Sequence, residues 1–194
     1  MIVLKLGGSL LSSPVLLQYL QLACEQGQGQ LIIVPGGGVF AEQVRVTQKQ
    51  WQYNDKTAHA MAILAMQQMA LLFQGVCAEL VLVDKVATIP MALQRQQVVV
   101  WSPLVTELDA AGLAASWDVT SDSLAAWLAI QLSAYKLLLV KSVAIPADAT
   151  LEQLSIAGII DQAFTRLVHD KSLMIECISI DQLSVLANCL RNNV

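Results

Sequence analysis

The chain has 194 residues, of which 56% are hydrophobic and 13% are charged. This length fits a single domain over residues 1–194, and the small charged fraction excludes a disordered chain or a solvent-extended coiled coil. The net charge of −4 disfavours nucleic acid and acidic membranes as partners, so any bound phosphate must be met by local groups. Because a monomer rarely exposes large apolar patches, the apolar excess predicts a homo-oligomer.

The N-terminus and the cysteines bear on the cellular compartment. The first apolar run is interrupted by Lys5 and ends at Gly7-Gly8, which predicts a strand rather than a signal peptide. The uncharged run 57–78 is long enough to cross a membrane, but its histidine and glutamines favour a helix buried between layers or subunits. We therefore expect a cytoplasmic protein with reduced thiols and without zinc. No metal-ligand spacing links the four cysteines, Cys24, Cys77, Cys177 and Cys189.

Apolar runs and helical patterns alternate along the chain. The predicted strands are 1–6, 30–34, 79–83, 98–101, 136–140 and 173–180. The predicted helices are 10–26, 39–50, a long one capped by Asn54 or Asp55 and ending near 74, 124–132, 150–157 and a last one from Asp181. This order predicts an α/β fold, a three-layer αβα sandwich around a mainly parallel sheet. Ligands of such sheets bind beyond the carboxyl ends of the strands, so the loops that follow strands are candidate sites.

The first such loop is Gly7-Gly8-Ser9, between a strand and a helix. Glycines permit close backbone approach, and free N–H groups at a helix start favour an anion, so the loop is a candidate phosphate site. It matches neither the Walker loop nor the dinucleotide fingerprint. Lys5 lies in an otherwise apolar strand, where a buried lysine needs an anionic partner. A plain tight turn with an edge lysine that reaches solvent is the alternative.

A second glycine loop, Gly36-Gly37-Gly38, follows the next strand. Three successive glycines cost backbone entropy, which favours a second anion or polar-headgroup site over a simple turn. Arg45, two helical turns further on, is either a bidentate clamp for that group or an exposed helix arginine.

A polar cluster precedes the helix predicted at 124–132 and contains Thr120, Ser121 and Asp122. Asp122 is either a simple carboxylate at a helix start or a group that orients a lysine. Asp55 and His59 have the i, i+4 spacing of one helix face, so they either face a substrate or serve as a cap and a packed histidine.

Four segments, VLKLGGSLL, VPGGGVFAEQVR, WDVTSDSLAAWLA and AYKLLLVKSV, resemble in this order the amino acid kinase family. Members of that family phosphorylate carboxylates, carbamate or phosphate monoesters with ATP. The resemblance covers roughly residues 1 to 165 and implies the amino acid kinase fold. The segments WDVTSDSLAAWLA, DKTAHAMAILAM and GIIDQAF are most similar to short kinases of the aminomethylfuran phosphate kinase type, which act in methanofuran synthesis and one-carbon cofactor metabolism.

The resemblance implies roles for several candidate residues. Lys5 contacts the transferred phosphoryl group, and Asp122 organises the lysines. Gly7 and Gly8 bind the ATP phosphates, and Gly36, Gly37 and Gly38 bind the acceptor. From the residues themselves we add Lys141 to the catalytic group and expect Ser9 and Ser142 at the nucleotide phosphates. We also expect further acceptor-binding residues, namely Arg45, Asp55, His59, Thr120 and Ser121. The implied cofactors are ATP and Mg²⁺, with the metal carried on the ATP oxygens, and the implied partner is a small-molecule phosphate acceptor.

The chain departs from the family in two places. Many relatives have a Thr-Asp-Val segment followed by a Gly-Gly-Met…Lys segment, whereas this chain has Lys141-Ser142-Val143 and then GIID at 158–161. Lys141 either replaces the missing second lysine or is structural. The segment 143–158 is too short for the usual adenine-binding region, which predicts a shortened C-terminal nucleotide lobe. Two alternatives therefore stay open: a noncatalytic ligand-binding or assembly protein, or a kinase for uridylate, isopentenyl phosphate or an amino-acid carboxylate.

Overall fold

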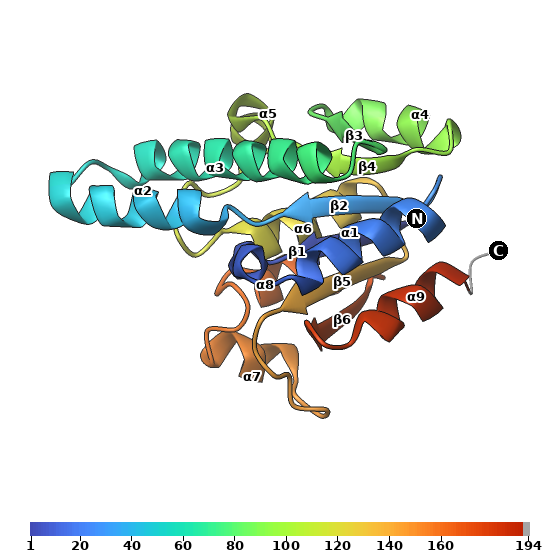
Figure 1. Cartoon of the computed structure of the whole chain (residues 1–194). Coiled ribbons are helices and arrows are strands. Elements are labelled where there is room, and N and C mark those ends of the chain that lie inside the picture. Colours follow the sequence, from blue (N-terminus) through green and yellow to red (C-terminus); the bar gives the residue numbers. More distant parts are fainter. Residues whose placement is uncertain (192–194) are drawn as a thin grey trace.

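A computed structural model describes residues 1–191, so the last three residues of the predicted 1–194 domain lie outside the described residues (Figure 1). Six parallel strands form one sheet in the order β3-β4-β2-β1-β5-β6. The strands are β1 (Ile2–Leu6), β2 (Leu31–Pro35), β3 (Leu80–Val83), β4 (Val98–Trp101), β5 (Lys136–Lys141) and β6 (Met174–Ser179). The predicted αβα sandwich around a parallel sheet is confirmed.

Helices cover both faces of this sheet (Figure 1). They are α1 (Val15–Gln26), α2 (Gly38–Trp51), α3 (Asp55–Val76), α4 (Ile89–Gln94), α5 (Val105–Ala110), α6 (Ser121–Gln131), α7 (Leu151–Ile156), α8 (Phe164–Val168) and α9 (Leu183–Arg191). Two 3-10 helices, η1 (Gly8–Ser12) and η2 (Val86–Thr88), complete the described elements. One apolar core contains side chains of α1, α3 and α9, and the other contains side chains of α3 to α8.

The alternation of side chains along β1 sets the direction of its lysine. Ile2, Leu4 and Leu6 point into the core under α1, whereas Val3 points into the core on the α6 side. Because successive side chains of a strand face opposite sides of a sheet, Lys5 shares the side of Val3 and faces α6. The sheet thus directs a buried lysine at the start of the helix that carries Asp122.

Three predicted boundaries were wrong. The helix predicted at 10–26 is divided into η1 and α1, because Ser13 precedes Pro14 and adopts an extended conformation. Helix α6 begins at Ser121 rather than at 124, so Asp122 lies inside its first turn. The last helix begins at Leu183, two residues after the predicted cap at Asp181. The short helices α4, α5 and α8 were not predicted, since five or six residues give little periodicity.

Among residues 1–191, α3 is long and apolar enough to cross a membrane, judged by length and composition only. Core helices of folded domains pass the same test. Its buried face, which includes Met66, Met69 and Phe73, packs into the two cores. Its outer face carries Leu64 and Leu71, which are 50% and 59% exposed.

Candidate active site

Lys5, Asp122 and Lys141 meet at the carboxyl end of the sheet. Lys5 and Lys141 come from the neighbouring strands β1 and β5, in which Leu6 pairs with Val140. Asp122 comes from the first turn of α6 and lies between the two ammonium groups. Its Oδ1 is 2.7 Å from the Nζ of Lys5, and its Oδ2 is 2.5 Å from the Nζ of Lys141. All three side chains are buried.

The charges of this cluster do not balance. Burial opposes ionisation of Asp122, but the charges of Lys5 and Lys141 outweigh it, and the pKa of the carboxyl is lowered. Burial together with the charge of Lys5 lowers the pKa of Lys141, while Asp122 and Asp161 act in the opposite direction. With both lysines protonated, two positive charges face one negative charge. A buried surplus of positive charge favours an anion at this end of the sheet.

The two glycine loops pack backbone against backbone. A Cβ on Gly8 would lie 2.1 Å from the amide nitrogen of Gly38, and a Cβ on Gly36 would lie 2.5 Å from that of Gly8. A Cβ on Gly37 would lie 2.5 Å from the Cβ of Ala41. At these three positions the absence of a side chain is therefore required by the packing of the protein itself. From the sequence, the glycines indicated only that the backbone can approach a ligand closely.

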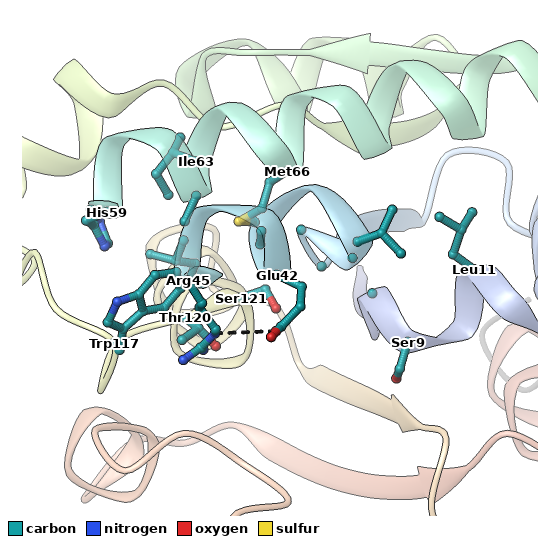
Figure 2. A pocket seen from close by; sticks show the side chains of 18 of the residues that line it. Ser9, Leu11, Glu42, Arg45, His59, Ile63, Met66, Trp117, Thr120 and Ser121 are labelled. Atoms are coloured by element: carbon teal, nitrogen blue, oxygen red, sulfur yellow. Dashed lines mark ion pairs between the residues drawn. The ribbon is translucent and has the colours of Figure 1, made fainter. Parts of the chain in front are cut away.

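A pocket of about 560 Å³ opens beside these loops, between α2, α3 and the start of α6 (Figure 2). Ser9 and Leu11 lie on one side of it, and Thr120 and Ser121 lie on the other side near Arg45 and Trp117. The glycines Gly8, Gly36, Gly37 and Gly38 also line the pocket. The apolar and aromatic part of the lining consists of Ala62, Ile63, Met66, Trp117, Val119 and Leu124. The pocket thus combines glycine loops and hydroxyl groups with an apolar wall.

Arg45 and Trp117 lie together on one side of the pocket (Figure 2). The guanidinium carbon of Arg45 lies 3.8 Å from the centre of the Trp117 ring, the geometry of a cation–π contact. The indole N–H of Trp117 donates to Gln48 Oε1 at 2.7 Å, which fixes the ring. Glu42, 4.0 Å from the Arg45 Nε, also lines the pocket (Figure 2). Arg45 is therefore held in place where a phosphate or another anion can reach it.

His59 and Asp55 are placed differently, although both lie on α3. His59 lines the pocket and is buried, whereas Asp55 is exposed. Asp55 accepts a hydrogen bond from Gln48 at 2.8 Å and borders a second hollow beyond Arg45 and Trp117. Burial lowers the pKa of His59, and its ring makes a hydrogen bond with the backbone of Ser116. A neutral imidazole with one donated proton retains one nitrogen that accepts a hydrogen bond.

The loop after β5 meets the first glycine loop through hydroxyl groups. Ser142 Oγ lies 2.9 Å from Ser9 Oγ, a contact between residues 133 positions apart. Both side chains are exposed and border the carboxyl end of β1 and β5. Residues 142–150 form a loop before α7. Within residues 1–191, no group of three or more His, Cys, Asp or Glu side chains could hold a metal ion.

Several residues of the site had no role in the sequence analysis. Trp117 lies inside one of the segments that resemble the family. Its contact with Arg45 depends on the packing of α2 against the segment before α6. Glu42 and Met66 lie on predicted helices, and nothing in the sequence marked them as pocket residues. Asp161 lies in the segment GIIDQAF and contacts Thr120. A sequence shows that such residues exist, but not which of them share a pocket.

The fold and this site define a three-layer α/β protein with a pocket at the carboxyl ends of its strands, and comparison with known proteins gives the family. The model of the amino acid kinase family matches residues 1–145, and the chain belongs to this family. A characterised relative is the [5-(aminomethyl)furan-3-yl]methyl phosphate kinase of Methanocaldococcus jannaschii, which is 29% identical over 150 residues. That match covers 75% of this chain and 65% of the relative, so it spans less than two thirds of that protein.

Solved structures show the same fold at low sequence identity. Uridylate kinase from Archaeoglobus fulgidus has a TM-score of 0.69 at 18% identity, with 94% of this chain and 95% of that chain covered. UMP kinase from Bacillus anthracis has a TM-score of 0.73 at 15% identity, with 98% and 91% covered. An isopentenyl phosphate kinase has a TM-score of 0.67 at 14% identity, with 98% and 96% covered.

Proposed function

We propose that the chain is a phosphotransferase that moves the γ-phosphoryl group of ATP to a phosphate monoester. An oxygen of the acceptor phosphate forms a bond to the transferred phosphorus while the bond to ADP breaks, so the products are ADP and a diphosphate. The observation that supports this most is the buried cluster of Lys5, Asp122 and Lys141 beside a pocket lined by glycine loops, hydroxyl groups and an apolar wall. Family membership and the kinase relatives support the reaction class.

The chain's own residues would act by position and charge, which supply most of the catalysis in phosphoryl transfer. Lys5 and Lys141 place two positive charges where negative charge gathers on the transferred group, and Asp122 fixes the direction of both ammonium groups. In this role Lys141 replaces the second lysine of the relatives. Gly7, Gly8, Ser9 and Ser142 would hold the nucleotide phosphates, because this loop lies beside the lysines. A Cβ on Gly7 would be 3.7 Å from the Nζ of Lys5, and the hydroxyl groups of Ser9 and Ser142 are 2.9 Å apart.

Both carboxylate oxygens of Asp122 are engaged by lysines. Mg²⁺ would therefore be carried by phosphate oxygens, and it would neutralise part of their charge when bound. In this arrangement the protein contributes ammonium, hydroxyl and N–H groups.

The shape of the pocket supports a compact acceptor with an apolar body. Its phosphate would lie at the glycine loops with Thr120 and Ser121, and the body would lie along Ile63 and Met66. The neutral ring of His59 would accept a hydrogen bond from an amine at the far end. These features fit an acceptor like aminomethylfuran methyl phosphate, the compound in the name of the Methanocaldococcus relative. We propose the same setting, a cytoplasmic homo-oligomer in one-carbon cofactor synthesis.

The test combines binding and turnover. Thermal unfolding is recorded with MgATP, with MgADP and with four acceptors: aminomethylfuran methyl phosphate, UMP, isopentenyl phosphate and glycerol phosphate. A ligand at 100 times its Kd adds about 2.7 kcal/mol to the stability, so both nucleotides should raise Tm. Phosphorus NMR should then show a diphosphate product with the aminomethylfuran compound. Absence of nucleotide stabilisation would instead support a noncatalytic binding protein, and turnover of UMP or isopentenyl phosphate alone would replace the proposed acceptor.

A further inference from the structure

Asp161 lies in the loop between α7 and α8, and its carboxylate binds the start of α6. Oδ2 accepts hydrogen bonds from the backbone N–H groups of Thr120 and Ser123, both at 2.9 Å. Oδ1 accepts from the Thr120 hydroxyl at 2.5 Å. Close by, the backbone N–H of Ala163 donates to the carbonyl of Asp118 at 3.1 Å. The loop is thus attached to the segment that enters α6 at several points.

Asp161 supplies the cap that α6 lacks. Thr120 is the N-cap residue, yet its side chain makes no capping bond to the helix, and its hydroxyl donates to Asp161. The N–H of Ser123, which a capping side chain would ordinarily bind, is bound by Asp161 from 38 residues away. A carboxylate at this position also interacts favourably with the positive end of the helix dipole.

The residue between these anchor points is Asp122. Thr120 and Ser123, on either side of it, are both held by Asp161, and its own oxygens lie 2.7 and 2.5 Å from the two lysines. A displacement of the first turn of α6 would therefore separate the carboxylate from one or both ammonium groups. Errors of about 1 Å in positioning can lower turnover by roughly a hundredfold.

The charge of Asp161 also reaches Lys141. Among the groups around that ammonium, Lys5 and burial disfavour its protonated form, and Asp122 and Asp161 favour it. Cys177, the other titratable side chain that interacts with Lys141, has a pKa raised to about 11, chiefly by burial, and stays neutral near pH 7. Removal of the Asp161 charge should lower the pKa of Lys141.

We propose that Asp161 is a positioning residue of the active site, which holds the first turn of α6 so that Asp122 can align Lys5 and Lys141. It acts from the segment in which many relatives have Gly-Gly-Met and a lysine. The proposal rests on the proposed phosphoryl transfer, since the alignment matters only if the lysines face a reacting group. Asp161 touches no reacting atom in this scheme.

The test uses Asp161→Asn, which keeps the shape and removes the charge, and Asp161→Ala, which removes the cap. The matched control is Asp181→Asn, which alters a carboxylate near the start of α9 that accepts from Ser179 at 3.2 Å. Labelling of the lysine ε-carbons allows an NMR titration that measures the pKa of Lys141 directly. We expect Asp161→Asn to lower the pKa of Lys141, and the control to leave it unchanged.

Turnover of the acceptor identified above gives the second measurement. We expect kcat to fall at least tenfold in Asp161→Asn and further in Asp161→Ala, with acceptor KM changed less than threefold. An unchanged Lys141 titration in folded Asp161→Asn would overturn the proposal, and so would unchanged kcat. If the unmodified chain shows no turnover, the proposed function fails, and the titration alone then decides whether Asp161 acts on Lys141.

Discussion

Gly8 and Gly38 touch through their backbones, so that a Cβ on Gly8 would lie 2.1 Å from the nitrogen and 2.4 Å from the Cα of Gly38. Neither neighbouring atom belongs to a flexible side chain that can move aside. The loops after β1 and β2 are thereby joined into one surface at the floor of the pocket. The contact explains why a glycine is needed at this position even without a ligand.

Gly8→Ala should destabilise the protein by about 1 to 3 kcal/mol or more, the cost of forcing an atom into a closed contact. The control is Gly75→Ala, the same change in α3 where nothing lies within 4 Å of the new Cβ. That variant should gain about 0.5 to 1 kcal/mol from better helix propensity. Urea unfolding of both variants measures the difference. Equal stabilities would contradict the loop contact.

Lys5→Ala should lower kcat by roughly 10² to 10³, the effect of losing one preorganised electrostatic group, while acceptor KM changes less. Lys141→Ala should lower kcat to a similar extent if Lys141 replaces the missing lysine of the family. Lys136→Ala is the control, because it removes a buried lysine at the other end of β5, 2.6 Å from Glu176. Near-normal kcat in Lys141→Ala would assign that lysine a structural role.

Asp122→Asn should cost about 3 to 5 kcal/mol at pH 7, since it leaves two buried ammonium groups without their partner. The pKa of Asp122 is lowered from its ordinary 3.8, so its stabilisation is fully present above that value. It is lost as the pH falls through the lower pKa of the folded state. The measurement is urea unfolding at several pH values. The difference in the free energy of unfolding between the unmodified chain and Asp122→Asn should be constant above pH ~5 and should become smaller below pH ~4. A difference that stays the same at every pH would argue against the ion pairs.

The loss of kcat in Asp122→Asn should also be non-additive with the loss in Lys5→Ala.

The outer face of α3 should form part of a subunit interface. Leu64 and Leu71 are exposed and lie seven residues apart, which places them on the same helix face. A charge at either position would have to be buried in the interface, so Leu64→Lys and Leu71→Lys should shift sedimentation towards the monomer. Leu17→Lys, at an exposed leucine of α1, is the control. A monomeric unmodified chain at micromolar concentration would contradict the prediction.

The sequence by itself determined the layers, the parallel sheet and the two glycine loops. This was possible because apolar runs, helical spacing and glycine clusters are local features, and because the carboxyl ends of parallel strands always meet at one edge. The lysine in the apolar strand β1 also indicated an anionic partner. The residue pattern allowed two roles for Asp122, a simple carboxylate at a helix start or a group that orients a lysine.

The resemblance implied that Asp122 organises the lysines, but only the tertiary structure decided the geometry of this cluster and which other groups meet. Lys5 and Lys141 share Asp122 because β1 and β5 are neighbours and α6 begins above them. His59 enters the pocket and Asp55 does not, although both lie on the same helix. Asp161 caps α6 across 38 residues, a contact that no local pattern can specify. Such contacts depend on how whole helices and strands pack, because each side chain reaches only a few ångströms from its backbone.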